Sequence, residues 1–322
     1  MTAAAPTPVR TPTQPLERAL EVPSMGGRLT LRVAHGPGNE ALAAAALAAV
    51  AARVQCWAAR LTRYTDTSDL AALNLDPARP LTPVRPTLAA VLDWAERATD
   101  RAEGYLDVTL LDERLALQRP DPLPVLAADL EPHRWWLERR PRGAIVHRDA
   151  TFRFDTDGVA KGWIADRALE LLRRWPAVLV DADGDIAMRP APDTEWFIGI
   201  ADPRPDAEHE LAMLRFDDRL AGGRVAVATS GTSVHRWGQE PDGAPRHHLL
   251  DPLTRRPAIT DVVQATVIST SAREAEVLAK SALIAGSDAG FDLLERSGAR
   301  GAVLLLTSGE TIALPRTMEW LA

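Results

Sequence analysis

Apolar positions along the chain follow two different periods. Short runs with a period of two residues predict half-buried β-strands, and longer segments with apolar stripes three or four residues apart predict helices. The predicted strands cover residues 29–34, 151–154, 177–180, 196–200, 211–216, 224–228, 262–269, 302–306 and 311–314. The predicted helices cover residues 39–61, 86–103, 160–175 and 271–285, with a shorter one near Phe291. Because several strands are joined by short loops and others by helices, we expect an α+β fold: one large domain with mixed or antiparallel sheets and flanking helices.

Two segments lack this periodicity. Residues 1–23 are rich in proline and threonine, which predicts a disordered tail ahead of a domain that covers residues 24–322. Residues 119–142 contain many prolines and are expected to form an irregular connection. The tail has no apolar run of about 7–15 residues, so we expect neither a signal peptide nor a membrane anchor. No other stretch reaches the ~20 apolar residues of a spanning helix, and we expect a cytoplasmic protein with no membrane span.

Composition narrows the class of partner. The chain has 322 residues, of which 46% are hydrophobic and 25% charged, with a net charge of −7. A nucleic-acid-binding protein normally carries a basic face, so this balance argues against nucleic acid as a partner. The single cysteine, Cys56, lies in an alanine-rich helical stretch and is expected to be a buried thiol. We expect a monomer or a weak dimer.

Four polar clusters interrupt the apolar pattern, each at the end of a predicted strand. Residues 155–162 combine two glycines with Lys161 at a helix start, where backbone N–H groups and an ammonium group can bind phosphate. The alternative is a helix entry capped by Asp157. Residues 181–185 hold three aspartates, which suit a divalent cation or the polar groups of a ligand as well as a solvated turn.

The other two clusters also allow two interpretations. Residues 229–231 (Thr-Ser-Gly) offer hydroxyl groups for phosphate or amide contacts, although the same string is common in turns. Residues 247–254 hold two histidines, an aspartate and a threonine. A histidine beside an acid can be a general base with an orienting partner, and the alternative is a structural histidine.

Taken in order, the clusters and three earlier motifs resemble the ApbE family of FAD:protein FMN transferases. Residues 24–27 resemble the family's Met-Gly-Thr element. Residues 63–74 resemble its next element, an aromatic residue followed by a Ser-rich turn and an Asn. Residues 104–109 loosely resemble its Gly-Ala-Phe-Asp-Pro-Thr stretch. The later boxes of the family resemble residues 157–162 (Asp-Gly-Val-Ala-Lys-Gly), 181–185 (Asp-Ala-Asp-Gly-Asp), 229–231 and 248–255. The similarity spans roughly residues 22–316.

The chain departs from the family in its last motif, which places an Asp and a Thr four residues apart on a helix, both facing a magnesium ion. Here Glu276 and Lys280 stand at these positions, on a helix that Ser271 and Glu274 start with a capping box. Positions four apart share a helix face, so Glu276 can reach a cation, but a protonated lysine has only donors to offer. Two interpretations follow: an ordinary surface pair, or an ammonium group that takes the place of the metal and neutralises the FAD diphosphate.

Two smaller departures concern glycines of the family. Asp183 and Arg255 stand where the family has glycine, and each adds a charge to its motif.

The resemblance implies an enzyme that moves FMN from FAD onto a Thr or Ser hydroxyl of an acceptor protein and releases AMP. Two alternatives are an FAD-binding protein that has lost transfer, and a pyrophosphatase that splits FAD into FMN and AMP. FAD is then the donor substrate, and Mg²⁺ is the metal that the family uses.

The resemblance also assigns residues. The expected base is His248, oriented by Asp251, and the expected metal-site residues are Ala160 and Glu276. The residues expected to bind FAD are Met25, Tyr64, Leu106, Asp107, Lys161, Asp166, Asp185, Thr229, Ser230, Thr254 and Lys280.

Overall fold

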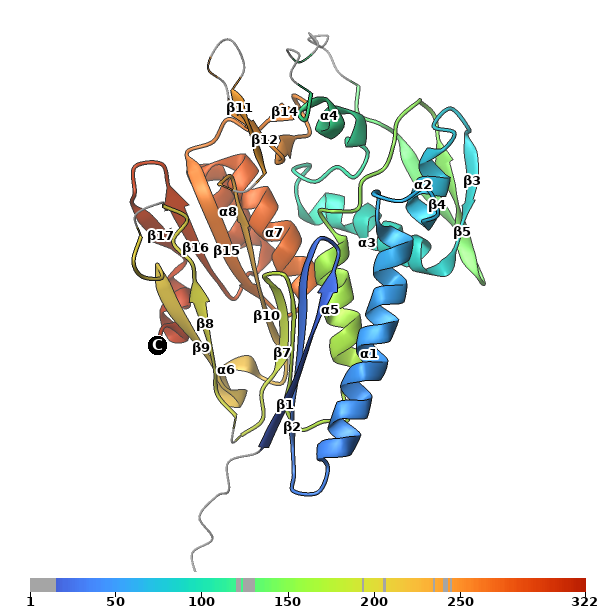
Figure 1. Cartoon of the computed structure of the whole chain (residues 1–322). Helices are drawn as coiled ribbons and strands as arrows, with labels where there is room; N and C mark the ends of the chain where they lie inside the picture. Colours follow the sequence, from blue (N-terminus) through green and yellow to red (C-terminus); the bar gives the residue numbers. More distant parts are fainter. Residues whose placement is uncertain are drawn as a thin grey trace, which may run out of the picture.

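The computed structural model describes residues 16–119, 123, 131–192, 194–204, 207–233, 235–239, 243 and 245–322. Its centre is an eight-stranded sheet in which every neighbouring pair is antiparallel (Figure 1). In spatial order the strands are β1 (Leu16–Ser24), β2 (Gly27–His35), β6 (Val178–Ala182), β7 (Asp185–Arg189), β10 (Val225–Gly231), β15 (Val262–Ser269), β16 (Gly301–Leu306) and β17 (Thr311–Ala313). The predicted α+β fold with a largely antiparallel sheet is confirmed.

Alternate residues of the sheet pack on its two faces, because successive side chains of a strand point to opposite sides. In β6, Val178 and Val180 join the core beneath the helices, whereas Leu179 joins the core on the other face. The helices that cover the first face are α1 (Glu40–Leu61), α5 (Ala160–Leu171), α7 (Ala272–Ala285) and α8 (Ser287–Ser297). The elements next to the second face are β8 (Trp196–Ile200), β9 (Ala212–Phe216), α6 (Asp218–Ala221) and the 3-10 helix η1 (Pro315–Trp320).

A smaller sheet lies beside the helices. Its order is β3 (Leu81–Val84), β5 (Gly143–Arg148), β4 (Trp135–Arg140). It packs with α2 (Asp69–Asn74) and α3 (Pro86–Arg101), and α4 (Leu111–Ala116) follows α3 along the chain. Four short strands form two hairpins near α4 (Figure 1): β11 (Arg236–Gln239) with β12 (Pro245–His247), and β13 (Leu250–Asp251) with β14 (Arg256–Pro257).

Two expectations about irregular segments were wrong. Residues 16–23, expected in a disordered tail, form most of β1, because every residue of that strand pairs with β2. The rest of the tail, residues 1–15, lies outside the described residues. Within the irregular connection expected at 119–142, residues 135–140 are β4, which pairs with β5 along its whole length. Each segment is the first strand of a hairpin, and hydrogen bonds to the strand that follows it in the chain stabilise it.

The strand predicted at residues 151–154 is also wrong, although its alternation is real. Phe152 and Phe154 are buried, but the segment makes only an isolated bridge between Arg153 and Leu110. The side-chain amide of Asn74 takes the place of a partner strand, because its Oδ1 accepts the Phe154 N–H (2.8 Å) and its Nδ2 donates to the Phe154 carbonyl (2.8 Å).

Helix α1 corrects two further expectations. Cys56 is exposed, because it lies on the outer side of the helix, away from the buried positions Val54 and Ala58. By length and hydropathy α1 is also apolar enough to cross a bilayer, contrary to the expectation that no stretch qualifies. Its alanines account for this composition, and its buried residues contact the sheet and neighbouring helices.

Candidate active site

A cavity of about 650 Å³ lies at the end of the main sheet where the β1–β2 and β6–β7 turns meet the starts and ends of helices. Gly26 and Asp183 from these turns line it, together with the last residues of β10, the start of α5 and the C-terminal part of α7. Loops around residues 105–110 and 248–250 complete the lining. The cavity gathers ten of the residues expected at the site: Met25, Tyr64, Leu106, Asp107, Lys161, Asp185, Thr229, Ser230, His248 and Lys280.

Helices α5 and α7 cross in backbone contact beside the cavity. A Cβ atom at Gly162 would lie 2.6 Å from the Ala272 carbonyl oxygen, so only glycine allows this approach. Glu276 is fully buried at the crossing, where its Oε2 accepts the Gly162 N–H (2.9 Å). Its Oε1 accepts a hydrogen bond from Lys280 Nζ (2.9 Å), and that ammonium group also donates to the Gly158 carbonyl (3.2 Å). Lys280 therefore lines the cavity with the buried Glu276 behind it, and the two are not an ordinary surface pair.

A second lysine and two aspartates stand next to this pair. Lys161 Nζ lies 3.4 Å from an Asp183 carboxylate oxygen. Asp183 adopts the left-handed backbone conformation (φ 61°) that a glycine would adopt without strain. Burial raises the pKa of Asp185 well above its usual value, and the nearby Glu276 carboxylate raises it further, against the opposing effect of Lys280 and Lys161. The wall thus combines two ammonium groups with a cluster of carboxyl groups.

A network of arginines and aspartates lies on another side of the cavity. Arg114 on α4 pairs with Asp155 (3.1 Å) and with Asp157 (2.6 Å), and Arg63 lies within 4.0 Å of both carboxylates. Asp157 is therefore engaged by arginines and does not cap α5, whose N-cap residue Val159 makes no side-chain bond. Arg63 also donates to the Tyr64 hydroxyl (2.7 Å), and its guanidinium carbon lies over the Tyr64 ring, 4.5 Å from the centroid. Tyr64 is otherwise exposed and lines the cavity.

The adjacent histidines have different environments. His247 Nε2 lies 3.1 Å from the Ala258 carbonyl and its Nδ1 accepts the Leu249 N–H (3.3 Å), so both ring nitrogens are used within the fold. His248 lines the cavity, and its buried Nδ1 has no hydrogen-bond partner among the described residues. Burial lowers the pKa of His248 to about 3, helped by the positive charge of Arg114, so its imidazole is neutral near pH 7.

The remaining cavity residues come from turns and strand ends. Met25 has a positive φ of 49° in the β1–β2 turn, and Leu106 is buried. Asp107 is held in place by Thr109, whose N–H (2.8 Å) and hydroxyl (2.6 Å) donate to its carboxylate. At the end of β10, Thr229 is exposed and Ser230 is buried.

Five expected residues do not line the cavity: Glu276, which lies behind Lys280, and Asp251, Thr254, Asp166 and Ala160. The Asp251 carboxylate accepts the Leu253 N–H (2.9 Å) and the Thr254 hydroxyl (3.3 Å), so Asp251 and Thr254 close their own turn instead of contacting His248. Asp166 accepts the Ala272 N–H (2.9 Å) at the start of α7 and pairs with Arg224. Ala160 is buried in the first turn of α5. These placements indicate structural contacts, and those of Asp251 and Asp166 do not support an orienting or FAD-binding role.

Sequence reasoning did not select several residues that the structure brings to the cavity. Arg114 belongs to a short helix outside any motif, and only its pairing with two distant aspartates reveals it. The His235 ring stands edge-on to His248, with centroids 5.3 Å apart. Tyr105 and Ile284 also contribute to the lining. For Tyr105, its position next to Leu106 was the only available signal.

The residues around Glu276 do not fit a divalent cation. Such ions take oxygen ligands at roughly 2.0–2.6 Å, but the Lys280 ammonium group already holds both Glu276 Oε1 and the Gly158 carbonyl. Within the part of the chain that the structure describes, no group of three or more His, Cys, Asp and Glu side chains is placed to hold a metal ion.

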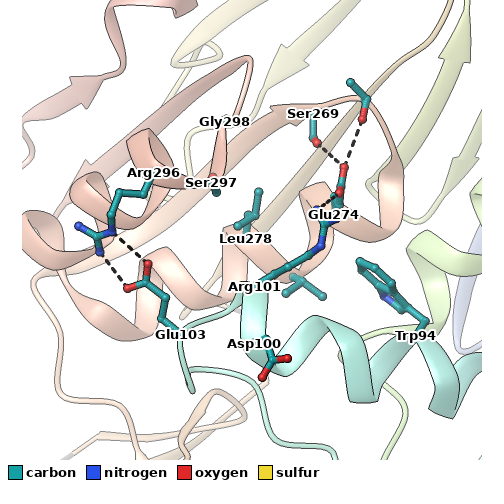
Figure 2. A pocket seen from close by; sticks show the side chains of 12 residues that line it. Trp94, Asp100, Arg101, Glu103, Ser269, Glu274, Leu278, Arg296, Ser297 and Gly298 are labelled. Carbon is teal, nitrogen blue, oxygen red and sulfur yellow. Dashed lines mark hydrogen bonds and ion pairs between the residues drawn. The ribbon is translucent and has the colours of Figure 1, made fainter.

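A second cavity, of about 450 Å³, lies between α3, α7 and α8 and has different chemistry. Figure 2 shows two ion pairs among its charged side chains: Arg296 pairs with Glu103 (2.8 Å), and Arg101 pairs with Glu274. Ser269 donates to the same Glu274 (3.2 Å). None of the residues expected at the site lines this cavity.

Comparison with known proteins places this geometry in context. The model of the ApbE family matches residues 25–304. The chain is 26% identical over 259 residues to an FAD:protein FMN transferase of Treponema pallidum, covering 73% of this chain and 69% of that protein. It is 31% identical over 125 residues to an FAD:protein FMN transferase of Klebsiella pneumoniae, covering 38% of this chain and 36% of that protein.

Solved structures agree in fold. The flavin transferase ApbE from Vibrio cholerae superposes with a TM-score of 0.76 at 21% identity, covering 95% of this chain and 100% of that one. The apo form of the Pseudomonas stutzeri flavinyl transferase ApbE gives a TM-score of 0.76 at 20% identity, covering 96% of this chain and 98% of that one. These similarities extend over nearly the whole chain.

Proposed function

This chain belongs to the ApbE family, and from that premise we propose that it transfers the FMN part of FAD to a Thr or Ser hydroxyl of an acceptor protein. The hydroxyl oxygen forms a new bond to the FMN-side phosphorus of the FAD diphosphate. The bond from that phosphorus to the bridging oxygen breaks, AMP leaves with this oxygen, and the hydroxyl proton passes to a base. The observation that carries the proposal is the cavity itself, which gathers two ammonium groups and a neutral histidine.

The proposed roles follow from charge and position. Lys161 and Lys280 supply positive charge for the diphosphate, which is the main requirement of phosphoryl transfer apart from alignment. His248 is the proposed base: it lines the cavity, and the negative charge of a bound diphosphate would raise the pKa of its imidazole from the low value that burial gives it toward the range of an effective base. The exposed ring of Tyr64 offers a stacking surface for an aromatic part of FAD.

The polar groups of FAD need partners as well. Asp107, Asp185, Thr229 and Ser230 line the cavity and are the proposed partners of the flavin and the adenosine. We assign no step to Mg²⁺, because Lys280 takes up the oxygen atoms beside which the ion would have to bind. The cytoplasmic location and the monomeric or weakly dimeric state stay predictions, which cell fractionation and light scattering would test.

The proposal is tested with purified protein and FAD. We expect FAD binding in calorimetry, and little flavin attached covalently to the chain itself. When the purified protein and FAD are incubated with proteins of the source cell, in-gel fluorescence should reveal a flavin-labelled acceptor. AMP should form in an amount equal to the flavin transferred. A chain with His248→Ala is the control for background labelling.

The alternative functions give different products in the same assay. AMP release from FAD with no acceptor present would indicate a pyrophosphatase, with water as the attacking group. FAD binding with neither AMP nor labelled protein would indicate a binding protein. Absence of FAD binding at about 100 μM, an affinity weaker than roughly −5.5 kcal/mol, would contradict all three functions.

A further inference from the structure

Lysine is used at only two positions of the 322-residue sequence, 161 and 280, whereas all other basic charges apart from histidine are arginine. Both lysines line the same cavity. A guanidinium group is planar and spreads its charge, whereas an ammonium group is a compact point charge with three donors. The distribution of lysine therefore marks this cavity as the place where a compact cation is needed.

The contacts of Lys280 hold its ammonium group at a fixed point of the wall. Glu276 Oε1 and the Gly158 carbonyl take two of its three donors, at 2.9 Å and 3.2 Å. Glu276 is itself immobilised, because it is fully buried and its other oxygen accepts the Gly162 N–H. The side chain of Lys280 keeps 17% of its surface exposed, so the third donor remains for a ligand in the cavity.

A divalent cation and this ammonium group exclude each other. Any ion bound by Glu276 Oε1 would stand within a few ångströms of Lys280 Nζ, and like charges in such a poorly screened place repel strongly. The ion would also compete for the oxygens to which the ammonium group donates.

We propose that Lys280 acts as a built-in cation: its ammonium group replaces the divalent metal ion and contacts the FAD diphosphate, so that FAD binding and FMN transfer by this chain need no divalent metal. The inference rests on the proposed function, because the diphosphate is that of the proposed substrate. It assigns to Lys280 a binding role that an ordinary helix-surface lysine would not have.

The first measurement is calorimetric titration of the wild-type protein with FAD, in EDTA and in MgCl₂. We expect the same affinity in both. A parallel titration with MnCl₂ alone, followed by electron paramagnetic resonance, should show no ion bound at the site. The Lys280→Thr variant, which removes the ammonium group and adds a hydroxyl beside Glu276, should bind Mn²⁺ and acquire magnesium-dependent FAD affinity.

A charge-balanced variant separates the binding role from simple neutralisation of Glu276. Lys280→Met alone leaves a buried carboxylate unpaired and is at risk of unfolding. In Glu276→Gln/Lys280→Met both charges are removed, so the net charge is unchanged. If the ammonium group contacts the diphosphate, this double variant loses about tenfold to a hundredfold in FAD affinity, the size of one charge-assisted hydrogen bond. The matched control is Asp93→Asn/Arg97→Met, which removes both charges of an i,i+4 pair on α3, outside the cavity.

The presence of only two lysines gives a direct spectroscopic readout. In protein labelled with ¹³C-lysine, the two ε-methylene signals should both shift on addition of FAD, and neither should shift on addition of MgCl₂ alone.

The outcomes distinguish the two levels of the proposal. Metal-independent FAD binding with a weakened double variant supports it. FAD binding or AMP release that requires magnesium, with the double variant like wild type, overturns the role of Lys280 and leaves the proposed function standing. No FAD binding under either condition overturns both.

Discussion

Two buried carboxylates link helices α5 and α7 in opposite directions. Asp166 on α5 accepts the Ala272 N–H (2.9 Å) at the start of α7, and Glu276 on α7 accepts the Gly162 N–H (2.9 Å) at the start of α5. Both contacts place a negative charge at a helix N-terminus, where it is favourable. Asp166 is otherwise paired with arginines outside the cavity, whereas Glu276 is paired with Lys280 in the cavity wall. The same interaction, a carboxylate that accepts an N–H at a helix start, thus supports helix packing at one end of the crossing and the candidate site at the other.

The adjacent histidines repeat this contrast. Both ring nitrogens of His247 have partners within the fold, whereas the buried Nδ1 of His248 has none among the described residues. A polar group whose hydrogen bonds are all made within the fold has a structural role. A polar group in a cavity wall that lacks a hydrogen-bond partner indicates a ligand-binding role. Four predictions test this distinction, from the largest expected effect to the smallest.

The largest effect is expected for His248→Ala. Loss of the proposed base should lower the rate of FMN transfer by about 10²–10⁴-fold and leave FAD affinity nearly unchanged. Single-turnover kinetics and calorimetry measure the two quantities separately. A variant with collapsed FAD affinity but a normal rate per bound FAD would make His248 a binding residue.

Asp166→Asn should affect stability and not the site. Loss of the carboxylate leaves Arg224, Arg273 and one helix N–H without their partner, and we expect the free energy of unfolding to fall by roughly 3 kcal/mol. Urea unfolding measures this change, and FAD titration of the folded variant should match wild type. A folded variant with weakened FAD binding would contradict the assignment of Asp166 to packing.

The pH dependence of stability tests His248 a second way. Its pKa is lowered from 6.5 to about 3 in the folded state, so below pH 6.5 the unfolded chain binds the proton and the folded chain does not. The contribution of His248 to the free energy of unfolding is therefore fully present above pH 6.5 and is lost as pH falls. The loss between pH 7 and pH 5 is roughly 2 kcal/mol. Between pH 7 and pH 5 the urea midpoint should fall less steeply for the His248→Gln variant than for the wild type. Equal slopes would show that His248 is not buried as a neutral group.

The smallest effect is expected for Asp251→Asn. Its carboxylate closes a turn with Leu253 and Thr254, so the variant should lose about 1 kcal/mol of stability and keep the wild-type transfer rate. A rate loss comparable to that of His248→Ala would restore Asp251 as the partner that orients the base.

Local signals in the sequence were reliable where the stabilising contacts are local. The helix predicted at 271–285 begins as expected, because Ser271 Oγ accepts the Glu274 N–H (3.4 Å) within one turn. The helix predicted at 86–103 begins at Pro86 for a similar reason, since proline is favourable in a first turn. β1 and β4 were missed although each forms a hairpin with the strand that follows it, because the hydrogen bonds of a strand go to another segment and the residues of one strand alone do not reveal that pairing.

The sequence by itself determined the fold class and the order of the polar motifs, and it indicated that Glu276 and Lys280 share a helix face, because a helix repeats every 3.6 residues. Only the tertiary structure decided which face meets the cavity. That choice depends on the close crossing of α5 and α7 at Gly162, which buries Glu276 and directs Lys280 to Gly158. The same crossing turns Asp166 toward the start of α7 and away from the cavity. Helical spacing is a property of neighbours in the chain, whereas the direction a face points is set by what packs against it.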